Sequence, residues 1–458
     1  MRIVNLNPRS DIGASAWFVE LDGFRLLMDA GMHPKLDGRA ALPLYSEVER
    51  EDLDAIAITH CHHDHVGSVP VAMSYFPKTS VLMTKVSYFL LGRVLHNSVN
   101  VMLRQRDEQG IKEYPLYSHD QVEGNETQFQ GFKCNRPIEW GALQKARAGL
   151  RSPDLEFLDA GHAPGSAGIF LRGKSQTLFY TGDVCFHDQT LLRAAQFGGV
   201  QADILIMETT RGDRLAQPGF TRQAEIDRLT EAIQRVLARR GCVLIPAFAL
   251  GRTQEILALL ALLMDAGRIP RQPIYIGGLG RVFTEIHDQK SHLADRQHPD
   301  LKLTRDLQLM VLEKEQLQNL KLTGGRLFVL TAGMLTEGTP AHDLALRMMG
   351  DERQAILFVG YADPATPGGR LKASKPGEPF VFSAAAGEVT RHCEMHDFNL
   401  TAHANREALL DFVGQVSPRT VLLGHGELPA RLWFEEQIRA RHPKIKIIQP
   451  APGLSVEV

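Results

Sequence analysis

The chain has 458 residues, enough for two domains of ordinary size or for one domain that carries a large insertion. Its 44% hydrophobic and 23% charged residues are typical of a globular protein with a buried core, and its apolar runs are too short to cross a bilayer. The net charge of −2 excludes the strong overall basic charge of many nucleic-acid-binding proteins, so a polyanionic partner has to be held locally.

The N-terminus and the cysteines indicate the compartment. The sequence MRIVNLNPRSD contains no basic leader followed by an apolar segment, so we expect a cytoplasmic protein without membrane contacts. The cysteines are odd in number, scattered, and never arranged as CxxC, so we expect buried free thiols and neither disulfides nor a thiolate zinc site. They are Cys61, Cys134, Cys185, Cys242 and Cys393.

The N-terminal part of the chain is predicted to be rich in strands. The apolar runs WFVEL and FRLLMDAG flank Asp22-Gly23, which is a strong signal for a hairpin turn. Further short apolar runs follow, separated by turn residues or polar helices. These runs are DAIAIT, SVLMT, LEFLDA, GIFLRG, QTLFYTGD and DILIMET.

From about residue 210 the pattern changes to alternating helices and strands. A helix is expected near residues 221–240 and another from Gly251, with apolar strand runs between and after them, which predicts a parallel sheet covered by helices. SKPGEP at 374–379 resembles a domain boundary, and strand-like sequence returns in the tail. We therefore expect one domain from residues 1–209 and 380–458, and a second from residues 210–379.

The strongest chemical signal is the run THCHHDH. It follows a buried strand, where side chains gather at the start of a loop. If the strand continues, His60 and His62 lie on one side, while Asp64 and His65 turn towards a second centre. A solvated polar loop is the alternative, but four potential metal ligands within six positions are hard to obtain by chance. The run therefore predicts two metal ions served by one segment.

Three other predicted strand ends supply further ligands. His162 in AGHAPGSAG, Asp183 in YTGDVC and His425 in LLGHGE each follow an apolar run. Histidine suits zinc and a carboxylate can bridge two cations, so we expect Asp183 to contact both ions. Each residue alone could be structural. The expected ligands are His60, His62 and His162 for one zinc ion, and Asp64, His65 and His425 for the other.

These motifs resemble those of a known family. LMDAG, THCHHDH, AGHAPGSAG and YTGD are similar to the four ordered motifs of the metallo-β-lactamase superfamily. Six later stretches resemble motifs of its β-CASP branch, which includes RNase J and the endonuclease subunit of messenger-RNA 3′-end processing. They are METT, PAFALGRTQE, LTAGML, FVGYADPATPGGRL, NLTAHAN and LLGHGE.

The resemblance covers nearly the whole chain and implies an α/β protein: an αββα sandwich with an inserted α/β β-CASP domain and an active site in the cleft between them. By position in the motifs, Asp29 is the acidic residue behind the ligands, where it would fix a ligand histidine. Glu208 is the acid of the first β-CASP motif, and His403 and His425 are the two later histidines. Two stretches depart from the usual motif sequences of the branch. NLTAHAN replaces the commoner FSAHAD type, and METTRGD replaces E-[SG]-T-Y-G.

The expected reaction is hydrolysis of RNA with two zinc ions. Two cations roughly 3.5 to 4 Å apart lower the pKa of a bridging water and neutralise phosphoryl oxygens. A histidine held by a carboxylate can protonate the leaving oxygen, and His403 with Glu208 fits this role. Asp64 is counted with them among the catalytic residues. The resemblance implies a product with a 5′-phosphate.

Four residues outside the motif histidines could bind phosphate. Backbone N–H groups at a helix start or a glycine-rich turn can donate hydrogen bonds to anions, and arginines add positive charge. The alternative is that these glycine-rich turns are structural. The candidates are Arg252 and Thr253 after Gly251, Gly333 in TAGML and Arg370 in TPGGRL.

Three other functions stay open at this point. A DNA nuclease is the first, although DNA-repair members of the branch typically carry valine where His425 stands. A small-ester or lactam hydrolase is the second, although a large insertion over the metals suits a polymer better. A non-catalytic scaffold is the third, although all seven ligand positions are filled. A homo-oligomer is compatible with the sequence.

Overall fold

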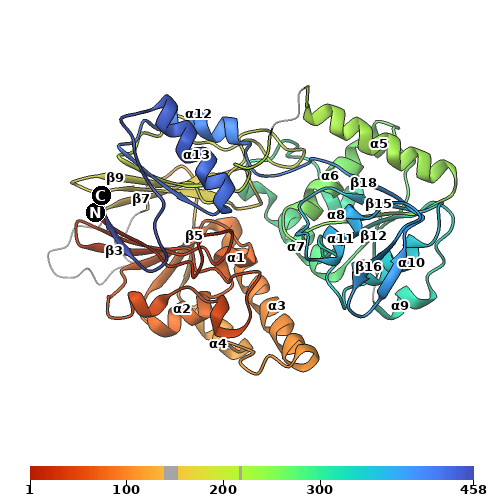
Figure 1. Cartoon of the computed structure of the whole chain (residues 1–458), viewed down its shortest axis with the longest axis horizontal. Helices are drawn as coiled ribbons and strands as arrows, with labels where there is room; N and C mark the ends of the chain where they lie inside the picture. Colours follow the sequence, from red (N-terminus) through yellow and green to blue (C-terminus); the bar gives the residue numbers. More distant parts are fainter. Residues whose placement is uncertain (139–152, 216–218, 313) are drawn as a thin grey trace. The chain divides into compact units, whose positions relative to one another are not determined.

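The computed structural model describes residues 1–138, 153–215, 219–312 and 314–458, which form two compact units (Figure 1). Unit 1 comprises Met1–Asp188, Ala194–Ala216 and His403–Val458, and unit 2 comprises Gln189–Arg193 and Gln217–Ala402. Each unit has a core of its own, and each is described separately below.

Unit 1 contains two sheets. The first has seven strands in the order β21-β1-β2-β3-β4-β5-β6. Its β2–β3 hairpin turns at Asp22 and Gly23, both with positive φ (52° and 82°), which is the backbone that the Asp-Gly pair predicts. The strands are β1 (Arg2–Asn5), β2 (Trp17–Leu21), β3 (Phe24–Met28), β4 (Ala55–Ala57), β5 (Ser80–Thr84), β6 (Phe129–Phe132) and β21 (Ser455–Glu457).

The second sheet of unit 1 has six strands in the order β20-β19-β10-β9-β8-β7. β10 pairs in parallel with both β9 and β19, although β19 follows it in the chain by more than 200 residues. The strands are β7 (Asp154–Asp159), β8 (Ala167–Arg172), β9 (Thr177–Tyr180), β10 (Ile204–Glu208), β19 (Thr420–Gly424) and β20 (Lys446–Ile448).

The two sheets pack face to face, and helices cover their outer faces. Ile204 and Ile206 of β10 point into the core between the sheets, while Leu205 and Met207 point to the other side, as the two-residue period of a strand requires. The outer side of the second sheet is covered by α12 (Arg406–Val416) and α13 (Leu428–Arg441). α3 (Lys85–Gln109) packs on β5 and β6 of the first sheet. The αββα sandwich expected from the sequence is confirmed.

Shorter helices complete unit 1 on the side of the first sheet. α3 is capped at its start by Thr84, whose side chain accepts from Ser87 N, and after its last turn by Gly110 with φ 71°. α4 packs against both α2 and α3. These helices are α1 (His63–Val66), α2 (Val69–Tyr75) and α4 (His119–Glu126).

Unit 2 is built around a six-stranded parallel sheet in the order β13-β12-β14-β11-β15-β18. The central strands β11, β14 and β15 are buried on both faces because helices lie on both sides. Val243 and Ile245 of β11 pack against α5 and α6, and Leu244 packs with α10 on the opposite face. The strands are β11 (Val243–Pro246), β12 (Ile274–Ile276), β13 (Leu309–Val311), β14 (Leu327–Leu330), β15 (Ala355–Phe358) and β18 (Glu394–Asp397).

Two helices of unit 2 lie where the sequence predicts them. The helix expected near 221–240 is α5 (Arg222–Ala238), and the one expected from Gly251 is α6 (Arg252–Asp265). The others are α7 (Gly278–Gln289), α8 (Leu303–Asp306), α9 (Lys314–Asn319), α10 (Pro340–Met349) and α11 (Pro367–Ala373). A hairpin of β16 (Pro379–Ser383) and β17 (Gly387–Thr390) follows α11.

The expected boundary near residue 379 lies before the end of unit 2, which continues to Ala402. The reason is strand pairing: β18 is the edge strand of the unit 2 sheet, paired with β15 from Ala355 to Phe358. A proline- and glycine-rich stretch at 374–379 therefore marks the loop before a hairpin and not a change of unit.

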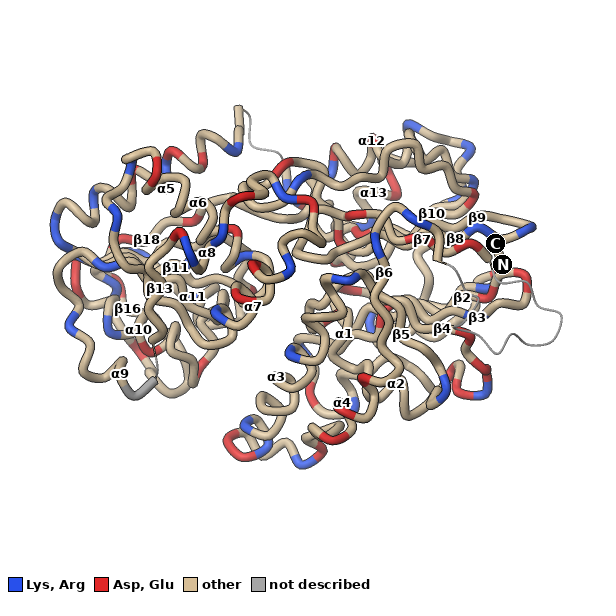
Figure 2. The backbone as a smooth tube through the Cα atoms, turned by 180° about the vertical axis from the view of Figure 1, so that it is seen from behind, with Lys and Arg blue, Asp and Glu red and all other residues tan. Residues whose placement is uncertain are grey.

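The cysteines agree with the expectation that they are free thiols. All five cysteines are free thiols; Cys134 is half-buried and the other four are buried. Within the described residues, none of the helices combines the length and apolar character that crossing a membrane requires. Acidic and basic residues are interspersed along the described backbone of both units (Figure 2).

Candidate metal centre

The predicted ligands meet at one edge of the unit 1 sandwich, where several strands end. His162 follows β7, Asp183 follows β9, and His425 follows β19. β4 ends at Ala57, earlier than the sequence suggests, and His62 is the residue before α1. Loop and helix geometry, and not a continuing strand, therefore separates the ligands of the THCHHDH run.

The first group of ligand atoms comes from His60, His62, His162 and Asp183. His62 Nδ1 lies 3.0 Å from His60 Nε2 and 3.2 Å from His162 Nε2. One oxygen of Asp183, Oδ2, is 3.7 Å from the Nε2 atoms of both His60 and His162. Three ring nitrogens and one carboxylate oxygen thus surround a single point.

The second group comes from Asp64, His65 and His425. His425 Nε2 lies 3.2 Å from His65 Nε2 and 3.3 Å from Asp64 Oδ2. The other oxygen of Asp183, Oδ1, is 3.4 Å from His65 Nε2 and 3.3 Å from His425 Nδ1. Asp183 therefore faces the first group with one oxygen and the second group with the other.

The donor set fits two cations better than it fits hydrogen bonding. In the first group, one ring nitrogen lies 3.0–3.2 Å from two others, so hydrogen bonds cannot satisfy all three. The three rings cannot all be protonated either, because positive charges so close together would repel one another. Burial, together with the neighbouring histidines, holds the pKa of His60 well below its ordinary value, so its ring is neutral, as a metal ligand must be. Asp183 Oδ1 is buried and accepts no hydrogen bond from the described residues. Histidine nitrogens and carboxylate oxygens are ligands that zinc accepts.

Asp29 lies behind the second group, as expected, and contacts a ligand histidine. Its Oδ2 is 2.8 Å from His65 Nδ1, on the ring edge opposite Nε2. Thr59 donates to Asp29 from its backbone N (2.8 Å) and its hydroxyl, and Tyr180 donates from its hydroxyl (2.9 Å). Asp29 itself has φ 61°, so the backbone turns sharply to place this fully buried carboxylate. The carboxylate fixes the His65 ring with Nε2 towards the centre.

A third cluster joins Asp183 to Glu208 and His403. His403 Nδ1 is 3.0 Å from Glu208 Oε2, and His403 Nε2 is 4.0 Å from Asp183 Oδ2. Burial opposes the charged form of the His403 ring, but the Glu208 carboxylate outweighs it and raises the pKa of His403. The His403 ring thus pairs with Glu208 beside the two groups of candidate ligand atoms without belonging to either group.

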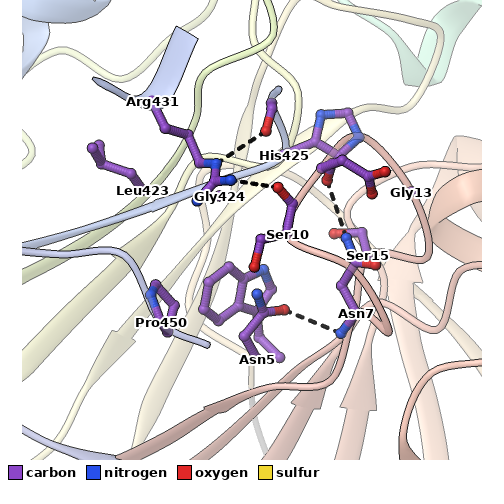
Figure 3. Close-up of a pocket in the computed structure, with 13 residues that line it drawn as sticks. Asn5, Asn7, Ser10, Gly13, Ser15, Leu423, Gly424, His425, Arg431 and Pro450 are labelled. Carbon is purple, nitrogen blue, oxygen red and sulfur yellow. Dashed lines mark hydrogen bonds between the residues drawn. The ribbon is translucent and has the colours of Figure 1, made fainter. Parts of the chain in front are cut away.

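The loop that carries His425 is held by a buried arginine. His425 has φ 44°, an uncommon backbone for a residue other than glycine. Arg431 of α13 donates to Gly426 O (3.2 Å) and to Ser10 O (2.5 Å). All three residues line a small pocket that His425 also lines (Figure 3). Arg431 therefore ties the histidine loop to the N-terminal loop of the same unit.

The phosphate-binding expectation for Arg252 and Thr253 needs correction. Both side chains are buried in unit 2, where Arg252 donates to Leu400 O (2.7 Å) and to Gln189 Oε1, and the Thr253 hydroxyl donates to Phe248 O (2.8 Å). These contacts hold the start of α6 in place, which is the structural alternative.

The other two candidates for phosphate binding differ from each other. Gly333 is buried, and a Cβ there would lie 3.2 Å from Phe248 N, so its small size serves close packing. Arg370 is exposed on α11 and stays a prediction.

The sequence analysis assigned no role to three supporting residues, Thr59, Tyr180 and Arg431. Thr59 and Tyr180 donate hydrogen bonds to Asp29, and Arg431 donates to the loop of His425. Thr59 and Tyr180 carry a signal, because they open the THCHHDH and YTGD runs, but neither run reveals that its first residue reaches Asp29. Arg431 lies in a helix without any local pattern that marks it.

Comparison with known proteins places these features in context. A model of the metallo-beta-lactamase superfamily matches residues 10–138, and a model of the Beta-Casp domain matches residues 253–371. A model of the Zn-dependent metallo-hydrolase RNA specificity domain matches residues 388–450. The three matches together extend over most of the chain.

Several relatives align over nearly the whole chain. Ribonuclease TTHA0252 of Thermus thermophilus is 30% identical, and the alignment covers 100% of both chains. Probable RNase MJ4 of Methanocaldococcus jannaschii is 28% identical over 93% of each. Cleavage and polyadenylation specificity factor subunit 3 of Dictyostelium discoideum is 24% identical over 100% of this chain, which spans 57% of that protein.

A solved structure shows the same fold. A protein of unknown function from Enterococcus faecalis V583 superposes with a TM-score of 0.59 over 99% of both chains, at 14% identity. The resemblance of the fold thus persists where little sequence similarity is left.

Proposed function

Since the chain belongs to the β-CASP branch of the metallo-β-lactamase superfamily of metallo-hydrolases, we propose that it is a zinc-dependent ribonuclease that uses two metal ions. The observation that carries this proposal is the position of Asp183 between two groups of ligand atoms, one oxygen towards each. A carboxylate placed in this way can hold two dications side by side. Bound there, two zinc ions would supply a hydroxide nucleophile near neutral pH and neutralise the phosphoryl oxygens.

The ligand assignment follows the two groups. We assign His60, His62 and His162 to one ion, Asp64, His65 and His425 to the other, and Asp183 to both. Asp29 keeps the His65 ring in the orientation that presents Nε2 to the centre. Asp64 also brings negative charge to the second group, since the adjacent His425 holds its pKa below the ordinary value against the effect of burial.

His403 is the proposed proton donor. Glu208 accepts a hydrogen bond from His403 Nδ1, which leaves the Nε2–H group to donate to the leaving 3′ oxygen. Glu208 is itself fixed, because Val184 N donates to its Oε1 at 2.7 Å. Glu208 also raises the pKa of His403 against the effect of burial, which favours the protonated ring that a general acid requires.

RNA is the preferred substrate class for two reasons. The match to an RNA specificity domain covers residues 388–450, which include both His403 and His425. The full-length relatives carry the names ribonuclease and RNase. The proposal extends these printed properties to this chain.

The test is a cleavage assay with matched nucleic acids. The purified protein, analysed for zinc, is incubated with RNA and DNA of one sequence, labelled at either end, with and without a chelator. We expect RNA to be cut, the activity to disappear with the chelator and to return with zinc, and products to carry a 5′-phosphate. RNA cleavage that persists after complete metal removal, or cleavage of DNA alone, would contradict the proposal.

A further inference from the structure

One arginine close to the metal centre has no counterpart among the residues already assigned a role. Arg211 follows Glu208 by three positions, on the turn that leaves the end of β10. In the stretch METTRGD, Arg211 occupies the position at which the usual family motif has tyrosine. This position is therefore a property of this chain and not of the shared motif.

The backbone under Arg211 is fixed by hydrogen bonds within unit 1. Thr209 N donates to His425 O (3.1 Å), and Gly212 N donates to Thr209 O (2.9 Å). A Cβ at Gly212 would lie 2.7 Å from Ala430 O, so the turn packs directly against α13. The Arg211 side chain thus leaves a rigid turn that also contacts the loop of His425.

The guanidinium of Arg211 has no partner within the described parts of the chain. It makes neither a hydrogen bond nor an ion pair there, and its Nε is buried without an acceptor. Arg25, whose Nε is also buried, differs because its Nη1 pairs with Glu51 at 3.0 Å. The Arg211 side chain is half-buried, and burial together with the neighbouring Arg214 lowers its pKa against the opposing effect of the nearby Glu208 carboxylate. Arginine stays protonated under all these influences.

A desolvated cation without an acceptor is costly unless an anion joins it. Resting on the ribonuclease function proposed above, we propose that Arg211 binds a phosphate of the RNA substrate beside the metal centre. Its planar group matches two oxygens of one phosphate. The chain has a net charge of −2, so it needs such local contacts to hold a polyanion.

The proposal is tested by RNA binding as a function of salt. The His403→Ala protein, in which cleavage is slow, serves as the parent, and anisotropy of an end-labelled single-stranded RNA gives its affinity. Adding Arg211→Ala should lower the affinity about tenfold and reduce the slope of log affinity against log salt by about 0.7. Arg211→Lys should keep the slope and recover part of the affinity, because the charge remains and the fork is lost.

Arg214→Ala is the matched control, since it removes an equal charge from an exposed side chain on the same turn. It should leave affinity and slope close to those of the parent, and zinc content should be equal in all variants. Equal effects of Arg211→Ala and Arg214→Ala, or an Arg211→Ala protein that binds as the parent does, would overturn the assignment. A zinc-loaded parent that binds no RNA would instead refute the ribonuclease function itself.

Discussion

Glu208 holds one edge of the His403 ring: its Oε2 lies 3.0 Å and its Oε1 3.2 Å from His403 Nδ1. Glu208 is 1% exposed and is anchored by Val184 N, so the ring has a fixed partner and a fixed orientation. The opposite nitrogen, Nε2, is 4.0 Å from Asp183 Oδ2. This relationship separates the proposed proton donor from the proposed ligands, and the first prediction follows from it.

His403→Ala should slow RNA cleavage by about 10²- to 10⁴-fold, the usual contribution of a positioned proton donor, while zinc content stays unchanged. His425→Ala should lower activity as well, but it should also weaken the second ion, because His425 Nε2 lies 3.2 Å from His65 Nε2. Elemental analysis and single-turnover rates distinguish the two variants. The assignment of His403 as the donor is wrong if its removal strips a metal or leaves the rate unchanged.

Glu208→Gln should shift the pH dependence of cleavage. A general acid has to be protonated, so the rate falls as the pH rises through its pKa. Glu208 raises the pKa of His403, and glutamine keeps the acceptor for Val184 N without the charge. The alkaline limb of the pH–rate profile should therefore move to lower pH. An unchanged limb in a variant with normal zinc content would argue against coupling between the two residues.

Asp183→Asn should abolish activity and reduce the zinc content while the fold is kept. The amide has no negative charge to offset two dications, although its size is the same. Asp183 is buried within unit 1, and its pKa lies well below the ordinary value because His425 and His65 outweigh the effect of burial. Elemental analysis with a thermal melt measures both effects. Near-normal turnover with two bound zinc ions would mean that Asp183 does not bridge.

Asp29→Asn should weaken one metal site more than the other. Asp29 contacts the ring of His65 but no ring of the first group, so the loss should affect the second ion, by about 10- to 100-fold in affinity. Tyr180→Phe, which removes only the hydroxyl that donates to Asp29, is the milder control. Competition with a chelator of known affinity resolves the two ions. An equal loss at both sites would show that Asp29 supports the fold and not one ligand.

Glu255→Gln should destabilise unit 2, most clearly at neutral pH. Glu255 is buried and accepts from Thr190 N and Leu191 N while it pairs with Arg222. Burial would raise the pKa of Glu255, but the neighbouring arginines and these N–H groups lower it. Its contribution to stability is therefore present above the pKa of the unfolded chain, about 4.3, and is lost as the pH falls through the folded-state pKa.

The expected loss is about 3 kcal/mol at pH 7, because the variant leaves a buried arginine without its counter-charge. The difference between variant and parent should shrink below pH 4. Denaturant unfolding at pH 7 and pH 3.5 measures it. Glu285→Gln, which breaks an exposed pair with Arg281, should cost less than about 1 kcal/mol and serves as the control. A loss for Glu255→Gln that is no larger than this, or that does not depend on pH, would contradict the prediction.

Local patterns explain how much of this protein could be predicted. The Asp22-Gly23 turn, the helix near 221–240 and the alternation of apolar runs depend on neighbouring residues, so the strand-rich N-terminal part and the parallel sheet of unit 2 were predictable. The αββα sandwich followed from the resemblance of the motifs to those of a known family. The ligand positions follow from short motifs at strand ends. The structure brings all seven of these residues together.

What could not be predicted depends on distant pairing. The end of unit 2 is set by β18 joining β15, which no pattern near residue 379 reveals. Arg252 and Thr253 share the local sequence of a phosphate-binding helix start, but they are buried by contacts to Leu400 and Phe248. Arg431 reaches Ser10 across 421 positions of the chain.

The interruption of unit 1 by unit 2 has a consequence during protein synthesis. A ribosome-bound chain that has emerged only to residue 402 contains His60, His62, His162 and Asp183, but neither His403 nor His425. It also lacks β19, the strand that pairs with β10. The nascent chain thus holds the first group of proposed ligands early, yet the second group stays incomplete until His425 is made, and the proposed proton donor His403 is missing as well.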